Sequence, residues 1–409
     1  MPTTPGSRPT CPPYIDWMEL NEQNATAGRS PNLSATLPVR SLVGWSHLLI
    51  GVVPLPLDTV APTPPWNFKI LPVRHRGITM HHRLPLALVL SVLVVSLSSQ
   101  PQQAQLSLAS TPISESMNLP GNVVVVVGDL VPGEAGAPQV DAAAVTRLTS
   151  QHDPDALIHV GDLQYYCGST QLFETRYGIH YGAMKPIIRP DIGNHEYCNG
   201  SWPDAPGYFA YFGAQAKPSG ASYYSWNLIL PSGKTVHFLN LNSNCLQWNK
   251  IAPGCGLTQA MRTWIREDLA ADNSDCVIAT WHEPAFGSEV PFHGDGKDAM
   301  REVWWTLESR GVDYIITGHA HNYQRYRAMH HDGTTTAPAV ASAIVGTGGR
   351  SLDDVTKFSW QSKLVALDDR HFGVMKMVFN STGTGWTQAF KTTSGASLDA
   401  VSFGCNNNK

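Results

Sequence analysis

Short apolar segments that end just before a side chain able to bind a metal ion recur along this sequence. The clearest is Ala156–Val160, which is typical of a buried strand and is followed by Gly161-Asp162. A carboxylate at the carboxyl end of such a strand points into the crevice in which open α/β sheets bind ligands. One Gly-Asp pair after a strand is more often a plain turn. Because the same pattern returns at four other strand ends, it restricts both the fold and the chemistry of the chain.

Strands and helices alternate through the carboxyl-terminal three quarters of the chain. The run of valines at Val123–Val127 is typical of a strand that is buried on both faces. The strands that we expect cover residues 123–127, 156–160, 186–189, 223–230, 235–241, 276–280, 312–317, 343–345, 374–379 and 386–390. The helices that we expect cover residues 139–150, 171–184, 261–271 and 299–309. This order predicts an α/β fold, a four-layer αββα sandwich of two mixed β-sheets flanked by helices, with a metal site at the carboxyl ends of the strands.

A basic start, a short apolar run and a small polar tail follow one another at residues 80–100. They are Met80-His81-His82-Arg83, Leu84–Leu97 and Ser98-Ser99-Gln100, and together they form the three parts of a secretory signal peptide. The apolar run is too short to span a bilayer comfortably, so a signal-anchor with a short cytosolic tail is the less favoured alternative. Because a signal peptide acts from the amino terminus, we expect translation to start at Met80 and the protein to be secreted.

The region before this segment has no sustained hydrophobic period. Residues 1–79 contain scattered Pro, Ser, Thr and Gly, so we interpret them as a disordered extension or a gene-model artefact. After the signal peptide we expect a linker at 101–120, a catalytic domain at 121–395 and a tail at 396–409.

The cysteines are consistent with an oxidising compartment. Of the seven Cys, Cys11 precedes the expected start, which leaves an even set. The remaining six are Cys167, Cys198, Cys245, Cys255, Cys276 and Cys405. We expect a bond between Cys245 and Cys255, which bracket one short polar loop. Asn199-Gly200-Ser201 and Asn380-Ser381-Thr382 are glycosylation sequons, meaningful in a eukaryotic protein.

The charge of the chain argues against nucleic acid as its main partner. The formal net charge is −4 at pH 7, and the sequence has no block of Lys and Arg. The sixteen histidines, in contrast, call for a search for metal sites.

Eight side chains at the five strand ends carry the atoms that metal ions bind. They are Asp129, Asp162, Tyr165, Asn194, His195, His282, His319 and His321. Each has a structural explanation when it is considered alone: Asn194 can cap a helix, and His282 can be a packed core histidine. His319 and His321 are two residues apart and would share one face of a regular strand. A core does not need polar residues at the same end of successive apolar strands, so together they predict a metal site.

The residue types indicate which ions would bind. Carboxylate, amide oxygen and imidazole without any thiolate suit Zn, Fe, Mn or similar ions. One central Asp can bridge two of them, and such a pair can bind the attacking and the leaving oxygen of a displacement at phosphorus.

The motifs closely resemble those of the metallophosphoesterase (calcineurin-like) superfamily, and within it the purple acid phosphatase-like branch. That branch is identified by D-x-G, G-D-x-x-Y, G-N-H-[DE], V-x-x-H and G-H-x-H in this order. Here the motifs stand as Asp129-Leu130-Val131, Gly161-Asp162-Leu163-Gln164-Tyr165, Gly193-Asn194-His195-Glu196, Ala279-Thr280-Trp281-His282 and Gly318-His319-Ala320-His321. The resemblance covers roughly residues 122–392. The sequence departs from the pattern in two places, where Leu130-Val131 replaces x-Gly and Ala279 replaces Val.

The resemblance implies a centre of two metal ions, Fe3+ with Zn2+, Fe2+ or Mn2+. Asp129, Tyr165 and His321 would hold the ferric ion, and Asp162 would bridge the two ions. Because Val131 stands where other branches of the superfamily place a His, Tyr165 would complete the first site.

The same resemblance implies that Asn194, His282 and His319 hold the second ion. His195 is not a ligand in the family, where it faces the substrate phosphate and can stabilise or protonate the leaving oxygen. His293 lies in a segment that resembles the stretch with a second substrate-facing histidine in the plant enzymes, although a solvated turn explains it equally well. The plant enzymes' separate β-sandwich has no counterpart in the chain, so we expect a stand-alone catalytic domain.

We therefore predict a secreted binuclear-metal phosphohydrolase, acid phosphatase-like, that cleaves phosphomonoesters by attack of metal-bound hydroxide. The alternatives are a phosphodiesterase or nucleotide hydrolase with the same site, and a non-catalytic secreted binding protein, which the intact ligand set disfavours. A serine hydrolase is disfavoured because no G-x-S-x-G segment follows a strand. The expected partner is a small phosphoester substrate, with no specific nucleic acid and no stable membrane anchor, and the oligomeric state stays open.

Overall fold

A computed structural model describes residues 117–133, 140–198, 201–202, 204–244, 259–288, 298–355, 360 and 362–405. All of these residues belong to one compact unit, Pro101–Lys409. The expectations for the signal peptide and the start site, for His293, and for the Cys245–Cys255 bond lie outside the described residues.

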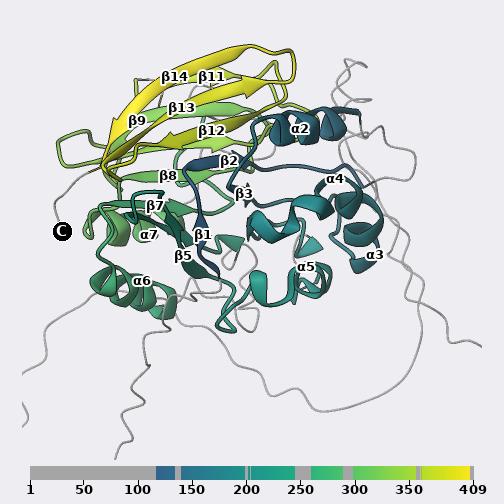
Figure 1. Cartoon of the computed structure of the whole chain (residues 1–409), viewed down its shortest axis with the longest axis horizontal. Coiled ribbons are helices and arrows are strands. Elements are labelled where there is room, and N and C mark those ends of the chain that lie inside the picture. The colour runs from purple at the N-terminus through teal and green to yellow at the C-terminus, as the bar shows by residue number, and fades with distance from the viewer. Residues whose placement is uncertain are drawn as a thin grey trace, which may run out of the picture. The chain divides into compact units, whose positions relative to one another are not determined.

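Two mixed β-sheets form the centre of this unit (Figure 1). The eight-stranded sheet has the order β1 (Leu119–Pro120), β5 (Tyr224–Ile229), β6 (Thr235–Asn240), β7 (Cys276–Thr280), β8 (Tyr314–Thr317), β10 (Val340–Val345), β9 (Tyr323–Met329) and β11 (Leu364–Asp368). The six-stranded sheet has the order β14 (Ser397–Gly404), β13 (Gly385–Thr392), β12 (Gly373–Phe379), β2 (Val123–Val127), β3 (Ala156–Val160) and β4 (Ile188–Asp191).

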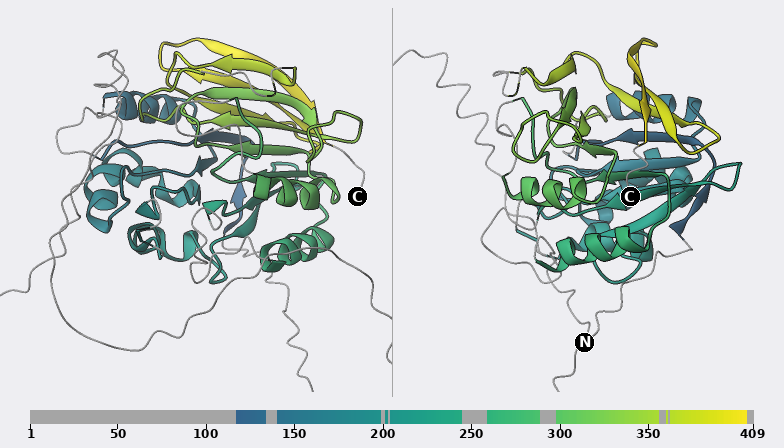
Figure 2. Two further views of the ribbon diagram at one scale, coloured as in Figure 1. Left: turned by 180° about the vertical axis from the view of Figure 1, so that it is seen from behind. Right: turned by 90° about the vertical axis from the view of Figure 1, so that its left-hand side faces the viewer.

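Helices pack against the outer face of the eight-stranded sheet and against the β2, β3 and β4 part of the six-stranded sheet, which gives four layers (Figures 1 and 2). The helices are α2 (Val140–Gln151), α3 (Thr170–Leu172), α4 (Gly178–Tyr181), α5 (Pro206–Phe212), α6 (Gln259–Ala271) and α7 (Asp298–Glu308). α6 is amphipathic because its apolar residues Met261, Trp264 and Ile265 lie on one face, and this face is buried. The predicted α/β sandwich is therefore confirmed.

Three apolar cores separate the layers. The core between the sheets contains Val124 and Val126 of β2 together with residues of the facing strands, whereas Val125 and Val127 face the helices that cover β2. The valine run at 123–127 is thus buried on both faces, as predicted, because its alternate side chains enter two different cores.

Several segments differ from the expected elements, among them β1, β9 and β11, which are strands that were not expected. The single helix expected at 171–184 consists of α3, a π-helical turn at Phe173–Tyr177, α4 and a 3-10 turn at Gly182–Ile187. Two glycines and one proline in this stretch weaken continuous α-helix, which accounts for the division. β14 lies beyond residue 395, so the six-stranded sheet continues into the segment that was expected to be a tail.

The parallel strands bring the predicted loops to one place. β2, β3 and β4 are parallel neighbours, so their carboxyl ends lie at one edge of the six-stranded sheet. β7 and β8 are parallel neighbours in the other sheet. The two edges are joined by hydrogen bonds from the Gly128 amide to the Val345 carbonyl (2.8 Å) and from His282 Nδ1 to the Val160 carbonyl (2.8 Å).

Two disulfides lie in the described part of the chain. They join Cys167 to Cys198 and Cys276 to Cys405. The sequon residue Asn380 is exposed at the turn between β12 and β13. None of the helices in the described ranges combines the length and hydrophobicity that a bilayer-spanning segment needs.

Candidate metal centre

Oxygen atoms reach the site from the loops that follow β2, β3 and β4. The Tyr165 hydroxyl donates to Asp129 Oδ1 (2.8 Å) and lies 3.2 Å from Asp162 Oδ2. Asp129 and Asp162 have φ values of 59° and 51°. Non-glycine residues seldom adopt this left-handed conformation, which here turns both carboxylates out of their strands and into the same space.

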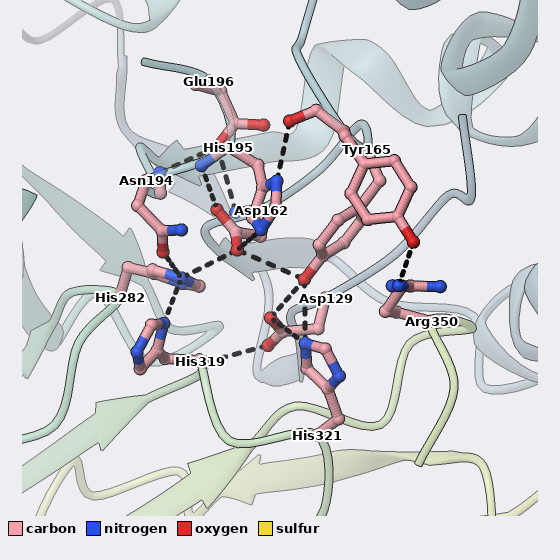
Figure 3. Close-up of polar contacts among 12 residues, drawn as sticks. Asp129, Asp162, Tyr165, Asn194, His195, Glu196, His282, His319, His321 and Arg350 are labelled. Carbon is pink, nitrogen blue, oxygen red and sulfur yellow. Dashed lines mark hydrogen bonds and ion pairs between the residues drawn. The ribbon is translucent and has the colours of Figure 1, made fainter. Parts of the chain in front are cut away.

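Imidazole nitrogens reach the site from the loops that follow β7 and β8 (Figure 3). His282 Nε2 lies 3.2 Å from His319 Nδ1, while His321 Nε2 lies 3.1 Å from the Tyr165 hydroxyl. His319 and His321 are not on a strand, and His319 has a φ of 74°. The two histidines therefore serve different parts of the site instead of sharing one strand face.

Asp162 lies in the middle of these donors. Its Oδ2 atom is 3.1 Å from His282 Nε2 and 3.2 Å from the Tyr165 hydroxyl. Asn194 Oδ1 is also 3.1 Å from His282 Nε2. The structure thus brings together all seven residues that the resemblance implied as metal ligands, in two groups that meet at Asp162.

The orientation of the histidines fits a cation. His282 Nδ1 donates to the Val160 carbonyl and His321 Nδ1 donates to the Ser351 carbonyl (3.0 Å). Each ring therefore turns its Nε2 atom, which carries the lone pair of the neutral tautomer, toward the carboxylates. Asp162, His282 and His319 each offer one ligand atom within 4.8 Å of the others. Such convergent lone pairs suit a bound metal ion.

Charge interactions within the cluster are strong. Burial lowers the pKa of His282, but the Asp162 and Asp129 carboxylates and the Val160 carbonyl together more than offset this and raise that pKa to about 10. Burial alone would raise the pKa of Asp162, yet the positive charges of His282 and His195 hold it well below its usual range. Both carboxylates are buried, so the cluster holds negative charge that a cation can neutralise.

The phenol of Tyr165 is also affected by its surroundings. Burial raises the pKa of the Tyr165 hydroxyl well above its usual value, and the Asp129 and Asp162 carboxylates raise it further. The positive charge of Arg350 acts in the opposite direction. Tyr165 therefore keeps its proton unless a stronger positive charge replaces it.

Glu196 holds two of the site loops together. Its carboxylate accepts backbone hydrogen bonds from Asp162 (3.0 Å), Leu163 (2.8 Å) and Gly193 (2.8 Å). Burial and the charge of Asp162 raise the pKa of Glu196 to about 8. Glu196 belongs to the Gly193–Glu196 motif, but the sequence does not indicate its role. Its partners are backbone amides, and contacts to backbone amides leave no pattern in a sequence.

Glycines allow the loops to approach so closely. A Cβ atom on Gly161, whose φ is 85°, would lie 2.5 Å from His282 Nδ1. A Cβ atom on Gly193 would lie 2.0 Å from Asp162 Oδ1. Any larger residue at either position would push the ligands apart.

His195 lies beside the cluster and is not part of its ligand contacts. Its backbone amide donates to Asp162 Oδ1 (2.8 Å), and its Nδ1 atom donates to the Tyr166 carbonyl (2.7 Å). Its Nε2 atom is 3.8 Å from Asp162 Oδ2, and 13% of the side chain is exposed. Burial lowers the pKa of His195. This position places a histidine at the accessible side of a buried centre.

The segment Gly346–Asp353 was missed by sequence reasoning. Its Asp353 carboxylate lies 3.4 Å from His321 Nδ1, and the Arg350 amide donates to the Asp129 carbonyl (3.1 Å). The available signal was the glycine-rich run directly after an apolar strand, which repeats the pattern of the other site loops.

Val131, the position of the main departure from the motif, is fully buried. Its side chain belongs to the core between the six-stranded sheet and its helices. This position serves packing here, and Tyr165 from the neighbouring loop supplies the donor atom at the centre.

A family model agrees with this geometry. Residues 122–323 match the calcineurin-like phosphoesterase model, and the matched stretch includes every residue of the cluster. The chain belongs to the calcineurin-like phosphoesterase superfamily.

Two curated relatives indicate its purple acid phosphatase-like branch. Purple acid phosphatase 15 of Arabidopsis thaliana is 24% identical over 58% of this chain and 47% of its own length. Purple acid phosphatase 18 of the same plant is 27% identical over 31% of this chain and 30% of its own length.

Solved structures share the fold. A purple acid phosphatase, PPD1 from yellow lupin seeds, has a TM-score of 0.53 and 19% identity, covering 69% of this chain and 53% of that chain. GAP50, the anchor in the inner membrane complex of Plasmodium, has a TM-score of 0.53 and 12% identity, covering 70% of this chain and 89% of that chain. At these identities the likeness extends to the fold alone. The chain matches 47% of the length of purple acid phosphatase 15 and 30% of the length of purple acid phosphatase 18, so it spans about half of these relatives or less.

Proposed function

We propose that this chain is a metal-dependent phosphoric ester hydrolase with a binuclear centre. The observation that carries the proposal is the position of Asp162 Oδ2, which lies between His282 Nε2 (3.1 Å) and the Tyr165 hydroxyl (3.2 Å). One carboxylate at this place can contact two cations at once. Two such cations, when bound, would lower the pKa of a water molecule and neutralise charge on a phosphoryl group.

The first ion would be held by Asp129, Tyr165 and His321, with Asp162 shared. These atoms form the group around the Tyr165 hydroxyl, with His321 Nε2 at 3.1 Å and Asp129 Oδ1 at 2.8 Å. A phenol suits a strongly charged ion, because it must lose its proton against the effect of burial. We therefore assign the ferric ion to this group, in agreement with the purple acid phosphatase-like branch.

The second ion would be held by Asn194, His282 and His319. An amide oxygen and two imidazoles, together with the shared Asp162, suit Zn2+, Fe2+ or Mn2+. The Val160 carbonyl fixes the tautomer of His282 so that its Nε2 atom faces the ion.

His195 is the group that we assign to proton transfer. The Tyr166 carbonyl binds its Nδ1–H, so Nε2 is the atom that faces the reacting groups. A histidine at this place can stabilise the phosphoryl oxygens or give a proton to the leaving oxygen. We propose phosphomonoesters as the substrates, since a terminal phosphoryl group is the simplest that can meet both ions.

We also propose that the protein is secreted. The proposal rests on the signal-like segment at 80–100 and on the disulfides Cys167–Cys198 and Cys276–Cys405, which suit an oxidising compartment. Amino-terminal sequencing of the protein recovered from culture medium should find a start close to residue 100. A mature protein that starts near residue 2 would contradict this proposal.

The central experiment is a panel of phosphoesters tested with the purified, metal-loaded protein. We expect hydrolysis of a phosphomonoester such as p-nitrophenyl phosphate, loss of hydrolysis after chelation, and recovery after metals are restored. Faster hydrolysis of a phosphodiester would change the substrate class. Absence of hydrolysis in a protein that holds both metals would contradict the enzyme, and would favour a binding role such as the anchor role of GAP50.

A further inference from the structure

A cationic side chain stands next to the candidate metal centre in a position that the ligand set does not use. It is Arg350, which follows Gly348-Gly349 in the loop after β10. Its guanidinium donates to the Tyr166 hydroxyl and lies over two aromatic rings, 5.3 Å from the ring centroid of Tyr165 and 4.7 Å from that of Tyr166. Figure 3 shows Arg350 at the edge of the cluster.

The backbone fixes Arg350 relative to both halves of the centre. Its amide donates to the Asp129 carbonyl (3.1 Å), and three residues later the Asp353 amide donates to the His321 carbonyl (3.0 Å). The segment lies close to the Asp129 loop, because a Cβ atom on Gly348 would be 2.4 Å from the Gly128 carbonyl oxygen. The segment that carries Arg350 is therefore hydrogen-bonded to the backbone of two proposed metal ligands, Asp129 and His321.

Arg350 and His195 border the same phenol. The His195 ring lies 4.3 Å from the Tyr165 ring, and its Nδ1 atom donates to the carbonyl of Tyr166, whose hydroxyl binds Arg350. Both side chains are partly exposed, while Tyr165 is buried. The accessible edge of the centre thus carries two nitrogen-rich groups linked through Tyr166.

The charge of Arg350 acts at this edge. A planar guanidinium donates two parallel hydrogen bonds to phosphate or carboxylate oxygens, which a point charge such as Lys does not reproduce. The guanidinium lies over the face of the Tyr165 ring, whereas the proposed ligand atom of Tyr165 is the hydroxyl at the edge of that ring.

We propose that Arg350, held by Tyr166, binds a second anionic group of the substrate, next to the phosphoryl group that reacts. The inference rests on the proposed function and deepens it by assigning the residue that recognises the second of two neighbouring anionic groups on a substrate. Arg350 then determines specificity, and Tyr166 is a positioning residue that holds the guanidinium.

The experiment compares ligands with one and with two anionic groups. Wild-type and Arg350→Ala chains, both loaded with metals, are titrated with inorganic phosphate and with methylenediphosphonate, which cannot be hydrolysed. We expect Arg350→Ala to weaken diphosphonate binding about 10- to 100-fold, the range for a hydrogen-bonded charge pair, and phosphate binding less than about 3-fold. The kinetic counterpart is a raised KM for pyrophosphate with little change for p-nitrophenyl phosphate.

Three variants make the result specific. Arg350→Lys keeps the charge without the planar fork and should restore only part of the diphosphonate affinity. Tyr166→Phe, which removes the hydrogen bond to the guanidinium, should cause a smaller loss in the same direction. Arg262→Ala is the matched control, because Arg262 forms an ion pair with Glu302 between α6 and α7, and it should behave as wild type.

Several results would overturn the inference. Equal weakening of phosphate and diphosphonate would show that Arg350 binds the reacting phosphoryl group, and unchanged affinities in both Arg350→Ala and Tyr166→Phe would show that it binds neither. Loss of metal from Arg350→Ala would show that it supports the centre itself. A wild-type chain that holds no metals and hydrolyses no phosphoester would instead contradict the proposed function, which separates the two failures.

Discussion

The two sheets contribute different chemistry to the centre. The six-stranded sheet supplies oxygen atoms, from Asp129, Asp162, Tyr165 and Asn194 at the ends of β2, β3 and β4. The eight-stranded sheet supplies imidazole nitrogens, from His282, His319 and His321 after β7 and β8. The acidic side chains of the centre therefore come from one sheet and its imidazoles come from the other.

This division shows why the fold matters for the site. Neither group of donors is complete by itself, since each proposed ion takes ligands from both sheets. The two groups meet where the sheets pack together: Asp162 and Asn194 contact His282, and Tyr165 contacts His321. The stability of the sandwich and the assembly of the centre are consequently linked.

The largest loss of turnover is expected when Asp162, which contacts donors from both sheets, loses its charge. Asp162→Asn keeps the shape of the side chain but loses the charge that both ions would share. We expect turnover to fall by about 10⁴-fold or more, because two-metal catalysis needs both cations in place. Steady-state kinetics and metal analysis of the variant measure this. Asp275→Asn, at a surface ion pair with Lys234, is the control that should remain active; an active Asp162→Asn would end the two-metal interpretation.

The next effect concerns a residue that belongs to neither donor group. His195→Ala should retain its metals and lose about 10²- to 10⁴-fold in turnover, the usual contribution of general acid–base catalysis. His371→Ala, an exposed histidine bound to Asp368, is the matched control. A His195→Ala chain that is poor in metal would place His195 among the ligands and change the division between the two sides.

A third test examines the oxygen side alone. Tyr165→Phe removes only the hydroxyl that contacts Asp129 and His321, so the fold should survive. We expect any violet absorption from a ferric phenolate to disappear and the affinity of the first ion to fall by at least about 10-fold. Tyr166→Phe changes the neighbouring phenol, which is not a proposed ligand, and should keep the colour. Persistence of the colour in Tyr165→Phe would assign it to another group.

The smallest effect on the centre is expected from His159, a buried histidine that belongs to neither donor group, and it concerns the pH dependence of folding stability. Burial lowers the pKa of His159, in β3, to about 3, whereas an exposed histidine has a pKa near 6.5. As the pH falls from about 6.5 towards 3, the unfolded state takes up a proton that the folded state does not, so stability is lost by up to about 1.4 kcal/mol per pH unit.

This loss should be smaller in His159→Asn, whose amide can still bond to the Tyr177 hydroxyl. Urea unfolding at pH 8 and at several lower pH values measures the difference in slope. Parallel slopes for the two chains would contradict this explanation.

Much of this arrangement was predictable because it depends on local pattern. The apolar run before Gly161-Asp162 forms β3, and the valines before Asp129 form β2, since both runs are long enough to be strands and too short to be helices. The parallel order of β2, β3 and β4 followed from the helical segments between them. The proposed ligands could be selected from the sequence because each lies within a few residues after the end of a strand.

Other features depend on contacts between distant residues and have no local pattern. Arg350 contacts Tyr166 across 184 residues, and the glycine-rich run before it marks the loop without singling out this side chain. His319 and His321 are spaced as on a strand, but the φ of 74° at His319 turns them to different partners. The order of strands in the sheets, such as β12 next to β2, follows from tertiary packing that sequence period does not encode.

The most direct test is the metal stoichiometry of the purified protein. Elemental analysis of the wild-type chain, after loading and removal of free ions, should find two metal ions per chain, with iron as one of them. The same analysis of Asp162→Asn should find clearly fewer than two. A wild-type chain that holds one ion or none, or an Asp162→Asn chain that holds two as tightly as wild type, would contradict the account of a centre shared by both sheets.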